Sequence, residues 1–252
     1  IYTLSLHDAL PIYELRDAGR ATCCSRAREE RGISMAGYET KQEMFWSQSF
    51  GNEYIDRNKD AALVNRILPF WSDVLKRTGP LRSVLELGAN IGLNLRALKL
   101  LSRESEMDAV EINEEAAAIL EDWGGCRVHR GSILAFSPPR RWELVFTRGV
   151  LIHIDPDALQ RVYELMLEAS SRYILVAEYY NPKPVEVPYR GHEGLLFKRD
   201  FAGELMDREP SLRLVDYGFV YHRDPLFPQD DITWFLMAKD VHDGKKRGER
   251  MC

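Results

Sequence analysis

The sequence predicts an α/β protein with a mostly parallel sheet, helices on both faces and an antiparallel hairpin at one edge. Two observations predict it. Between residues 83 and 178, short apolar segments of strand length alternate with amphipathic segments of helical spacing, which is typical of a parallel sheet covered by helices. Near the end of the chain, strand patterns at 212–220 and 232–239 are separated by HRDPLFPQDD, which is too short for a helical crossover. These two strands are therefore expected to pair antiparallel.

The remaining elements follow in order along the chain. Residues 44–58 are aromatic and polar without a clean period, and residues 60–76 have a helical pattern in which Pro69 predicts a kink. The next strand patterns lie at 83–87, 107–111, 127–130, 143–147 and 173–178, and the helical patterns between them lie at 92–101, 114–122 and 157–169.

Four segments of different character divide the chain. Residues 1–34 precede the first methionine, show no sustained period, and begin with IYTLSLHDALPI, which resembles translated sequencing-adapter sequence. We expect them to be a non-native or disordered leader. Residues 35–80 are expected to form an N-terminal helical cap, residues 81–240 the α/β domain, and the polar residues 241–252 a disordered tail.

Composition narrows the classes of partner. The 252 residues carry a net charge of −5, so no overall positive field attracts nucleic acid or anionic membranes. No apolar run reaches the roughly 18 residues that a membrane span needs. The four cysteines have neither metal-ligand nor disulfide-framework spacing. We therefore expect a cytoplasmic protein that binds no metal, no nucleic acid and no membrane; the oligomeric state is left open.

The residues after each strand predict the ligand site, because a sheet of this kind binds ligands at the carboxyl ends of its strands. The first strand ends in ELGANIG, residues 86–92, whose small residues turn the chain directly into a helix and bring backbone N–H groups to an open edge. Glu111 ends the second strand. The dinucleotide fingerprint G-x-G-x-x-G fails, because Asn90 and Leu93 stand where its second and third glycines belong.

The pattern E-x-G-x-N-x-G instead resembles the first motif of class I S-adenosylmethionine (SAM) methyltransferases. SAM carries no phosphate, so a tight turn with one acidic residue suits its cationic amine. Asn90 is one of the few non-glycine residue types that tolerate a positive φ. The Glu111 carboxylate can accept both hydroxyls of a ribose.

The chain as a whole resembles the pseudaminic acid biosynthesis-associated methylases, a bacterial family of SAM-dependent methyltransferases. The resemblance runs in order from about Phe45 to Lys239 and rests on the segments FWSQSFGNEYIDRN, VLELGANIGLNLRAL, VEIN, FTRGVLIHI, ILVAEYYNP, YRGHEGLLFKRDFAGEL and DDITWFL. It implies a Rossmann-like class I methyltransferase fold with a seven-stranded sheet, SAM as cofactor, and a sugar or nucleotide-sugar substrate. It does not fix the acceptor atom.

The resemblance also implies the residues of the cofactor site. The methionine part of SAM would be held by Glu86, Gly88, Asn90 and Gly92, and the ribose by Glu111. Ile112 would flank the adenine, and Ser132 and Ile133 would close on it, at a place where a fuller methyltransferase pattern often has an acidic residue. The methionine and the transferred methyl group would lie near Arg148 and Gly149. Tyr54 and Arg57 would fold over the cofactor as part of a lid, or form a purely structural cap.

Catalysis of methyl transfer depends mainly on alignment, because the reaction is an in-line displacement with a neutral leaving group. An amine acceptor needs no strong base, whereas a hydroxyl benefits from one. His153, after the fourth strand, is the best candidate base by position and by its ordinary pKa; the alternative is a histidine satisfied by a backbone carbonyl. His192 is the second candidate.

The substrate is expected to meet the loop at 184–200, which carries Tyr189, Arg190, Lys198 and Arg199 above the strand ends. Arginine suits a phosphate- or carboxylate-bearing sugar, although a solvated surface loop would look the same. Two further pairs of residues point to the same edge of the sheet. Tyr179 and Tyr180 follow the fifth strand, and Asp230 and Asp231 begin the last, where they bind sugar hydroxyls or cap the preceding turn.

Two other function classes use the same cofactor half. A methyltransferase for tRNA or another nucleic acid should show a basic stripe near the site, and here basic residues are interleaved with acidic ones. EYYNP looks like the N-P-P-Y/F motif of base amino-methylases, but it follows the fifth strand rather than the fourth. The second class is a non-catalytic SAM-binding subunit, which only a measurement of catalytic turnover would exclude.

Overall fold

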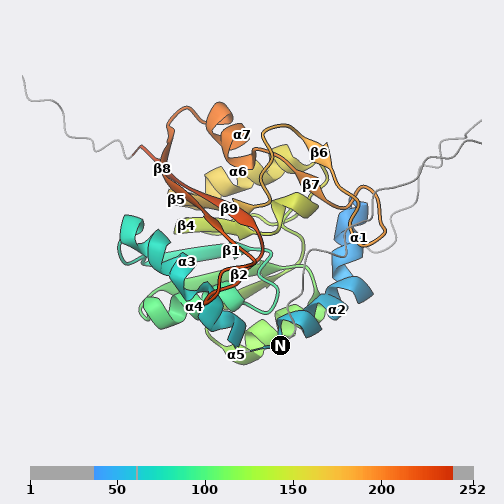
Figure 1. Ribbon diagram of the computed structural model, residues 1–252, viewed down its shortest axis with the longest axis horizontal. Helices are drawn as coiled ribbons and strands as arrows, with labels where there is room; N and C mark the ends of the chain where they lie inside the picture. The colour runs from blue at the N-terminus through green and yellow to red at the C-terminus, as the bar shows by residue number, and fades with distance from the viewer. Residues whose placement is uncertain (1–36, 61, 241–252) are drawn as a thin grey trace, which may run out of the picture.

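The protein, described here from a computed structural model of residues 37–60 and 62–240, is built on one seven-stranded sheet (Figure 1). The strand order is β3-β2-β1-β4-β5-β9-β8. The strands are β1 Ser83–Leu87, β2 Glu106–Glu111, β3 Arg127–Arg130, β4 Trp142–Arg148, β5 Ser170–Glu178, β8 Leu212–Val220 and β9 Ile232–Lys239. A second, two-stranded sheet pairs β6 Val185–Glu186 with β7 Phe197–Lys198.

Strand direction confirms the predicted architecture. β3, β2, β1, β4 and β5 are parallel, whereas β9 lies antiparallel to both β5 and β8. Leu175 of β5 pairs with Leu236 of β9. In the hairpin of β8 and β9, it is therefore the second strand that pairs with β5, and β8 forms the edge of the sheet. The bounds of β1, β3, β8 and β9 are those that the sequence predicts.

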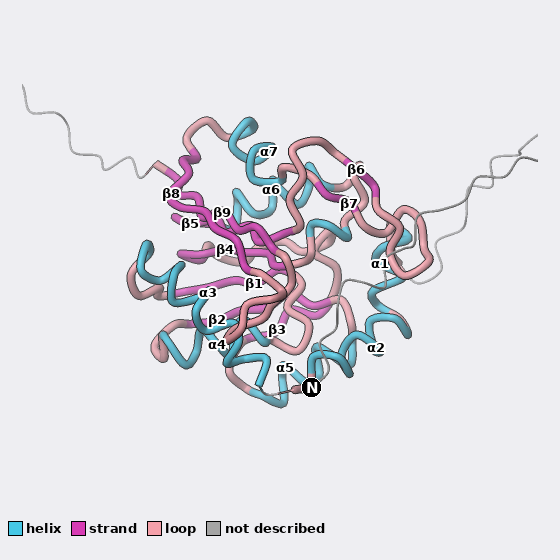
Figure 2. Tube along the Cα trace, viewed as in Figure 1, coloured by secondary structure: helices cyan, strands magenta, loops and turns pink. Residues whose placement is uncertain are grey.

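Helices cover both faces of the sheet (Figure 2). They are α3 Ala62–Thr78, α4 Leu93–Leu101, α5 Glu114–Trp123, α6 Leu159–Ala169 and α7 Phe201–Arg208. Successive residues of a strand point to opposite faces, so neighbouring residues of β1 enter different cores. Leu85 packs in the core that contains Met166 of α6, and Val84 packs in the core that contains Trp71 of α3 and Leu98 of α4.

Three helices lie outside the individual helical patterns that the sequence predicts, and two of them belong to the helical cap expected over residues 35–80. The segment 44–58, which has no clean period, lies in α1 Lys41–Ser47 and α2 Ser49–Asn58. α1 begins with a capping box, in which Thr40 Oγ1 accepts from the backbone N of Glu43 and the Glu43 carboxylate accepts from the backbone N of Thr40. α7 was not expected at all. Pro69 lies inside α3, which continues to Thr78.

α1, α2 and the β6–β7 segment lie together at one end of the sheet (Figure 1). Gln42 Nε2 of α1 donates to the carbonyl oxygen of Gly194 at 2.9 Å, which joins the N-terminal helices to the segment between β6 and β7. These pieces form a roof over the carboxyl ends of the parallel strands. The expected leader, residues 1–34, and the expected tail, residues 241–252, lie outside the residues that the structure describes. In the part that is described, no helix is long and apolar enough to cross a membrane.

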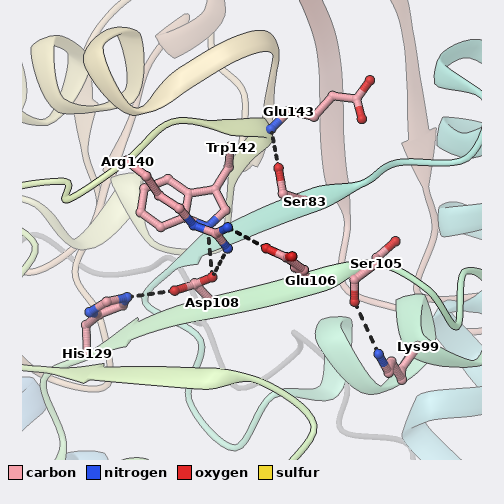
Figure 3. Close-up of polar contacts among 9 residues, drawn as sticks. All are labelled: Ser83, Lys99, Ser105, Glu106, Asp108, His129, Arg140, Trp142 and Glu143. Atoms are coloured by element: carbon pink, nitrogen blue, oxygen red, sulfur yellow. Dashed lines mark hydrogen bonds and ion pairs between the residues drawn. The ribbon is translucent and has the colours of Figure 1, made fainter.

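The opposite end of the sheet is held by a buried carboxylate (Figure 3). Asp108 of β2 is 1% exposed and accepts from His129 at 2.9 Å, from Arg140 at 2.7 Å and from Trp142 Nε1 at 2.9 Å. Burial favours the neutral acid, but the hydrogen bonds from Trp142, His129 and Arg140 outweigh it and hold the pKa of Asp108 below its ordinary value. This network joins β2, β3 and the start of β4.

Replacing this carboxylate should destabilise the fold and change its pH dependence. Asp108→Ala is expected to lower the free energy of unfolding by about 1–3 kcal/mol, the cost of leaving the buried Trp142 donor without an acceptor. Because the folded-state pKa is lowered, the contribution of Asp108 is present above the ordinary aspartate pKa and is lost as the pH falls through the lowered value. Chemical denaturation at a series of pH values checks this. Asp122→Ala, an exposed site on α5, is the control, and a loss no larger than the control's contradicts the prediction.

Candidate functional site

The turn after β1 is left-handed at three places. Gly88 has φ 75°, Asn90 has φ 49° and Gly92 has φ 78°. A Cβ on Gly88 would lie 2.7 Å from Cγ2 of Val150, so both its conformation and the close approach of Val150 require glycine there. The expected positive φ of Asn90 is confirmed, and its side chain accepts from the next backbone N–H, that of Ile91, at 2.6 Å. The turn is thus shaped by its residue types.

Glu111, at the end of β2, ties this turn to the next one. Its Oε2 accepts from the backbone N of Asn90 at 2.6 Å, and its Oε1 accepts from the backbone N of Asn113 at 2.8 Å. The side chain is 7% exposed, and burial raises its pKa although the backbone donors oppose that shift. The carboxylate therefore stands, rigidly held, between two loops at the carboxyl ends of β1 and β2.

Glu86 of β1 lies deeper. It is 1% exposed, and burial raises its pKa to about 8 even though Asn94 Nδ2 donates to its Oε1 at 2.7 Å. Its Oε2 is buried and has no hydrogen-bond partner among the described residues. Because buried polar atoms are nearly always paired, an acceptor left over beside a cavity indicates a donor that a ligand supplies.

Arg148, the last residue of β4, is the cation of this region. It donates through Nη2 to Gln229 Oε1 at 2.7 Å, and its guanidinium lies 5.3 Å from the ring centroid of Phe70. Burial lowers its pKa, and the carboxylates of Asp230 and Glu86 act in the opposite direction. The site thus holds one positive group close to two acidic ones.

A cavity of about 200 Å³ opens at this edge of the sheet. It is lined by eleven of the residues predicted to bind the cofactor or to act as base, namely Tyr54, Glu86, Gly88, Asn90, Glu111, Ile112, Ser132, Ile133, Arg148, Gly149 and His153. Gly92 does not line it; it caps the start of α4, where a Cβ would lie 2.4 Å from Cδ2 of Leu120. Within residues 37–60 and 62–240, no group of three or more His, Cys, Asp or Glu side chains is arranged to hold a metal ion.

Aromatic residues of α1 and α2 roof the cavity. The ring centroid of Trp46 lies 4.7 Å from that of His153 and 5.3 Å from that of Tyr54. Both Trp46 and Tyr54 line the cavity. Burial raises the pKa of Tyr54 to about 12, so this phenol stays neutral. Arg57 does not line the cavity; its guanidinium carbon lies 5.6 Å from the ring centroid of Phe50 and 6.0 Å from that of Tyr54. We call α1 and α2 the lid.

His153 lines the cavity and is also satisfied by a backbone carbonyl. Its Nδ1 lies 2.7 Å from the oxygen of Leu195, and since a carbonyl only accepts, Nδ1 carries the proton and Nε2 the lone pair. Burial lowers the pKa of His153 to about 4. The short helix η2 Leu151–His153 that presents it is held by Glu178, which accepts from the backbone N of Val150 and of Leu151, each at 3.1 Å.

The other candidate base lies outside this cavity. Tyr189 and His192 close a two-residue turn through reciprocal backbone hydrogen bonds of 2.8 and 2.9 Å, with Arg190 at φ 50° and Gly191 at φ 82°. The turn leaves Arg190 and His192 exposed. Tyr189 points inward, 4.9 Å from the ring of His153. The tip of this loop therefore stands beside the lid, at the rim of the site.

Several of the predicted substrate residues have structural partners instead. Arg199 forms an ion pair with Glu204 at 2.8 Å. Asp231 accepts from the backbone N of His222 at 3.0 Å and so closes the turn before β9, the alternative that the sequence left open. Tyr180 packs 5.7 Å from the ring of Phe235.

Tyr179 and Asp230 stay closer to the site. Tyr179 is half-buried, with Lys198 Nζ 5.2 Å from its ring centroid. Burial raises its pKa, and so do the charge of Asp230 and the neighbouring phenol of Tyr54. Asp230, Tyr54 and Tyr179 therefore lie within electrostatic reach of one another, next to Arg148.

Sequence reasoning missed four residues that build the site: Trp46, Asn94, Asn113 and Glu178. Asn94 bridges Glu86 and the Trp71 indole, whose Nε1 donates to Asn94 Oδ1 at 3.3 Å. Asn113 was readable as the residue that caps α5, since an asparagine followed by two glutamates is a helix start. The role of Glu178 depends on contacts across 26 to 28 residues, which a sequence pattern does not show.

Comparison with known proteins identifies the fold. No protein-family model and no curated protein matches the chain. Among solved structures it is similar to the magnesium protoporphyrin IX methyltransferase of Synechocystis PCC 6803 with bound S-adenosylhomocysteine (SAH), with 9% identity, a TM-score of 0.59, and coverage of 78% of this chain and 97% of that one. It is also similar to a Burkholderia thailandensis 1,6-didemethyltoxoflavin-N1-methyltransferase with bound 1,6-didemethyltoxoflavin and SAH, with 17% identity, a TM-score of 0.57, and coverage of 79% and 86%.

A third similar structure is DhpI in a complex with SAM and HEP, with 16% identity, a TM-score of 0.54, and coverage of 79% of this chain and 96% of that one. The chain therefore has the Rossmann-like fold of class I methyltransferases, as predicted. At these identities the comparisons establish the fold alone, and any function has to be inferred from the residues of the cavity.

The raised pKa of Glu86 can be tested through the pH dependence of stability. Since the folded-state pKa, about 8, lies above the unfolded value, the native state holds an extra proton between the two, and stability should fall as the pH rises from about 5 to 8. Glu86→Gln, which mimics the protonated acid, should abolish this decline. Thermal or chemical unfolding of both proteins over this pH range measures it, and parallel curves for wild type and variant would contradict the assignment.

Proposed function

We propose that the chain is a SAM-dependent methyltransferase that acts on a small molecule. The observation that carries the proposal is the pair of buried carboxylates at the cavity, one of them unpartnered, beside a left-handed turn with no dinucleotide fingerprint. The three structural neighbours named above were determined with SAM or SAH. These bound ligands support a SAM-type cofactor for the cavity of this chain.

The residues around the cavity suit each part of SAM. Glu111 has lone pairs left on both oxygens after its backbone hydrogen bonds, which suits the two ribose hydroxyls. The unpartnered Glu86 Oε2 suits the ammonium of the methionine part, and the guanidinium of Arg148 suits its carboxylate. Ile112, Ser132 and Ile133 supply a mainly apolar wall for the adenine.

SAM, when bound, supplies a methyl group on a positively charged sulfur. The chain's own task is then to align an acceptor and to exclude water, which for well-oriented reactants supplies several orders of magnitude in rate. Trp46 and Tyr54 line the cavity from the lid, and Gly149, Val150 and His153 line it from the segment after β4. No strong acid is required, because the leaving thioether is neutral.

The acceptor that we propose is a sugar or nucleotide-sugar of pseudaminic acid-type biosynthesis, in a bacterial cytoplasm. This rests on the family resemblance of the sequence, and the rim of the site is compatible with it. Tyr189 offers an aromatic ring beside His153, and the exposed guanidinium of Arg190 stands over the Tyr189 ring at 5.8 Å, free to meet a phosphate or carboxylate. Asp230 and Tyr179 offer hydrogen bonds to hydroxyls.

The direct assay of this function is incubation of candidate nucleotide sugars with SAM, followed by mass spectrometry. The proposal predicts a product heavier by one methyl group in place of one hydrogen, together with SAH. Methylation of tRNA in the same assay, with no modified sugar, would favour a nucleic-acid methyltransferase, and SAM binding without turnover of any acceptor would favour a non-catalytic subunit.

Glu111→Ala should weaken SAM binding and leave the fold intact. Loss of a charged hydrogen-bonding partner is expected to cost about 1.5–3 kcal/mol of binding free energy. Isothermal titration calorimetry measures the affinity, and circular dichroism confirms folding. Glu168→Ala, an exposed glutamate on α6, is the matched control. Unchanged SAM affinity in the Glu111 variant would remove this residue from the site.

His153→Ala distinguishes a hydroxyl acceptor from an amine. With a pKa of about 4, His153 is neutral at ordinary pH and its Nε2 is free to take a proton, although it is a weak base. For a hydroxyl acceptor we expect turnover to fall about 10²–10⁴-fold while SAM still binds. Rates measured across pH 6–8 check this. Full activity of the variant would show that alignment alone suffices and would favour an amine.

A further inference from the structure

Asn113 connects three parts of the molecule through one buried side chain and its backbone. The residue is 3% exposed. Its backbone N donates to Glu111 Oε1 at 2.8 Å, and its Oδ1 accepts from the backbone N of Ala116 at 3.0 Å, which caps α5. Its Nδ2 donates to the carbonyl oxygen of Trp46 at 3.3 Å and to Asn52 Oδ1 at 2.7 Å. The oxygen thus serves α5, and the nitrogen serves the lid.

On the lid, a glycine leaves room for the side-chain amide of Asn113. Gly51 of α2 faces it, and a Cβ there would lie 2.0 Å from the carbonyl oxygen of Trp46 and 2.6 Å from Asn113 Nδ2. Gly51 does not have a positive φ, so its backbone conformation does not require glycine. Glycine is required there because a Cβ would clash with these two atoms. Asn52 adds a second hydrogen bond to this side, from its Nδ2 to Glu115 Oε1 at 2.5 Å. We call Trp46, Gly51, Asn52 and Asn113 the latch.

The latch joins the lid to the carboxylate that the cofactor would use. Glu111 and Asn113 are fixed to each other by the 2.8 Å hydrogen bond, and Trp46, whose carbonyl the latch holds, also roofs the cavity and contacts His153. The same lid reaches the rim, since Phe50 lies 5.8 Å from the ring of Tyr189. A displacement of the lid therefore changes both the cofactor cavity and the acceptor side.

We propose that Asn113 is a positioning residue that couples the occupancy of Glu111 to the seating of the lid. The inference rests on the proposed function, since it takes Glu111 as the ribose-binding group. Coupling is reciprocal: a seated lid holds the Glu111 carboxylate in the orientation that ribose hydroxyls need, and a bound ribose stabilises the seated lid by the same free energy. The cofactor should accordingly bind first and complete the acceptor side through Trp46 and Phe50.

The competing explanation is that Asn113 only caps α5, and one substitution separates the two roles. Asn113→Asp keeps an oxygen that accepts from Ala116 N, and aspartate is as good a capping residue as asparagine. It removes the donor to Trp46 and sets a carboxylate against two oxygen acceptors. Asn113→Ser is a second variant that keeps the cap but does not reach the lid. Gly51→Ala attacks the latch from the other side, although alanine by itself favours a helix.

The experiment is amide hydrogen exchange of residues 41–58 in the full chain, with and without SAH, together with the SAH affinity by calorimetry. Wild type and the control Asn65→Asp, which adds the same charge at an exposed site on α3, should show slower exchange of the lid when SAH binds. Asn113→Asp, Asn113→Ser and Gly51→Ala should still bind SAH, about 10-fold more weakly, and should lose the SAH-dependent protection of the lid.

Three results overturn the coupling. Full protection and wild-type affinity in Asn113→Asp and Asn113→Ser would show that Asn113 only caps α5. Lid exchange that is unchanged by saturating SAH in wild type would show that lid and ligand are independent. Absence of SAH binding to wild type would overturn the proposed function itself, and with it the coupling, whereas the first two results leave the proposed function standing.

Discussion

The hydrogen bonds of Glu111 to the backbone of Asn90 and Asn113 are the interaction on which the rest of the site depends. One carboxylate fixes the turns after β1 and β2 relative to each other. Burying a carboxylate is costly, and the cost is offset only by donors that are already oriented. The left-handed backbone of Asn90 provides one of them, which explains why the turn needs residues that accept a positive φ. Geometry and charge are therefore set together by a few small residues.

Acidic groups gather at the carboxyl ends of three parallel strands, with the guanidinium of Arg148 among them. Glu86, Glu111 and Glu178 stand at the ends of β1, β2 and β5, and burial raises the pKa of each. Glu178 is used to hold η2, whereas Glu86 keeps a free oxygen. A ligand that brings a cation to Glu86 and hydroxyls to Glu111 relieves the cost of burying them. The charges and hydrogen-bonding groups of the site thus favour a cationic, hydroxyl-bearing molecule.

Period and turn chemistry were enough to predict most of the fold. β1, β3, β8 and β9 have the predicted bounds because their apolar residues and flanking turns are unambiguous. A helical cap was expected over residues 35–80, but the bounds of α1 and α2 were not predicted. Their aromatic residues face the cavity and the loop at 184–200 rather than a single core stripe, so no helical period appears. Gly88, Asn90 and Glu111 were predicted as site residues because strand ends meet at one edge, and all three line the cavity. Arg199 was predicted to meet the substrate, and Asp231 either to meet the substrate or to cap the turn. In the structure they contact Glu204 and His222, partners that only the folded chain brings to them.

The measurement that tests the central claim most directly is a calorimetric titration of the wild-type chain with SAH and, in parallel, with NAD. Both ligands carry an adenosine, but only NAD carries the pyrophosphate that a dinucleotide-binding turn cradles. The account predicts that SAH saturates one site per chain and that NAD produces no saturable heat. Saturable binding of NAD without binding of SAH would contradict it, because the turn after β1 would then hold a pyrophosphate.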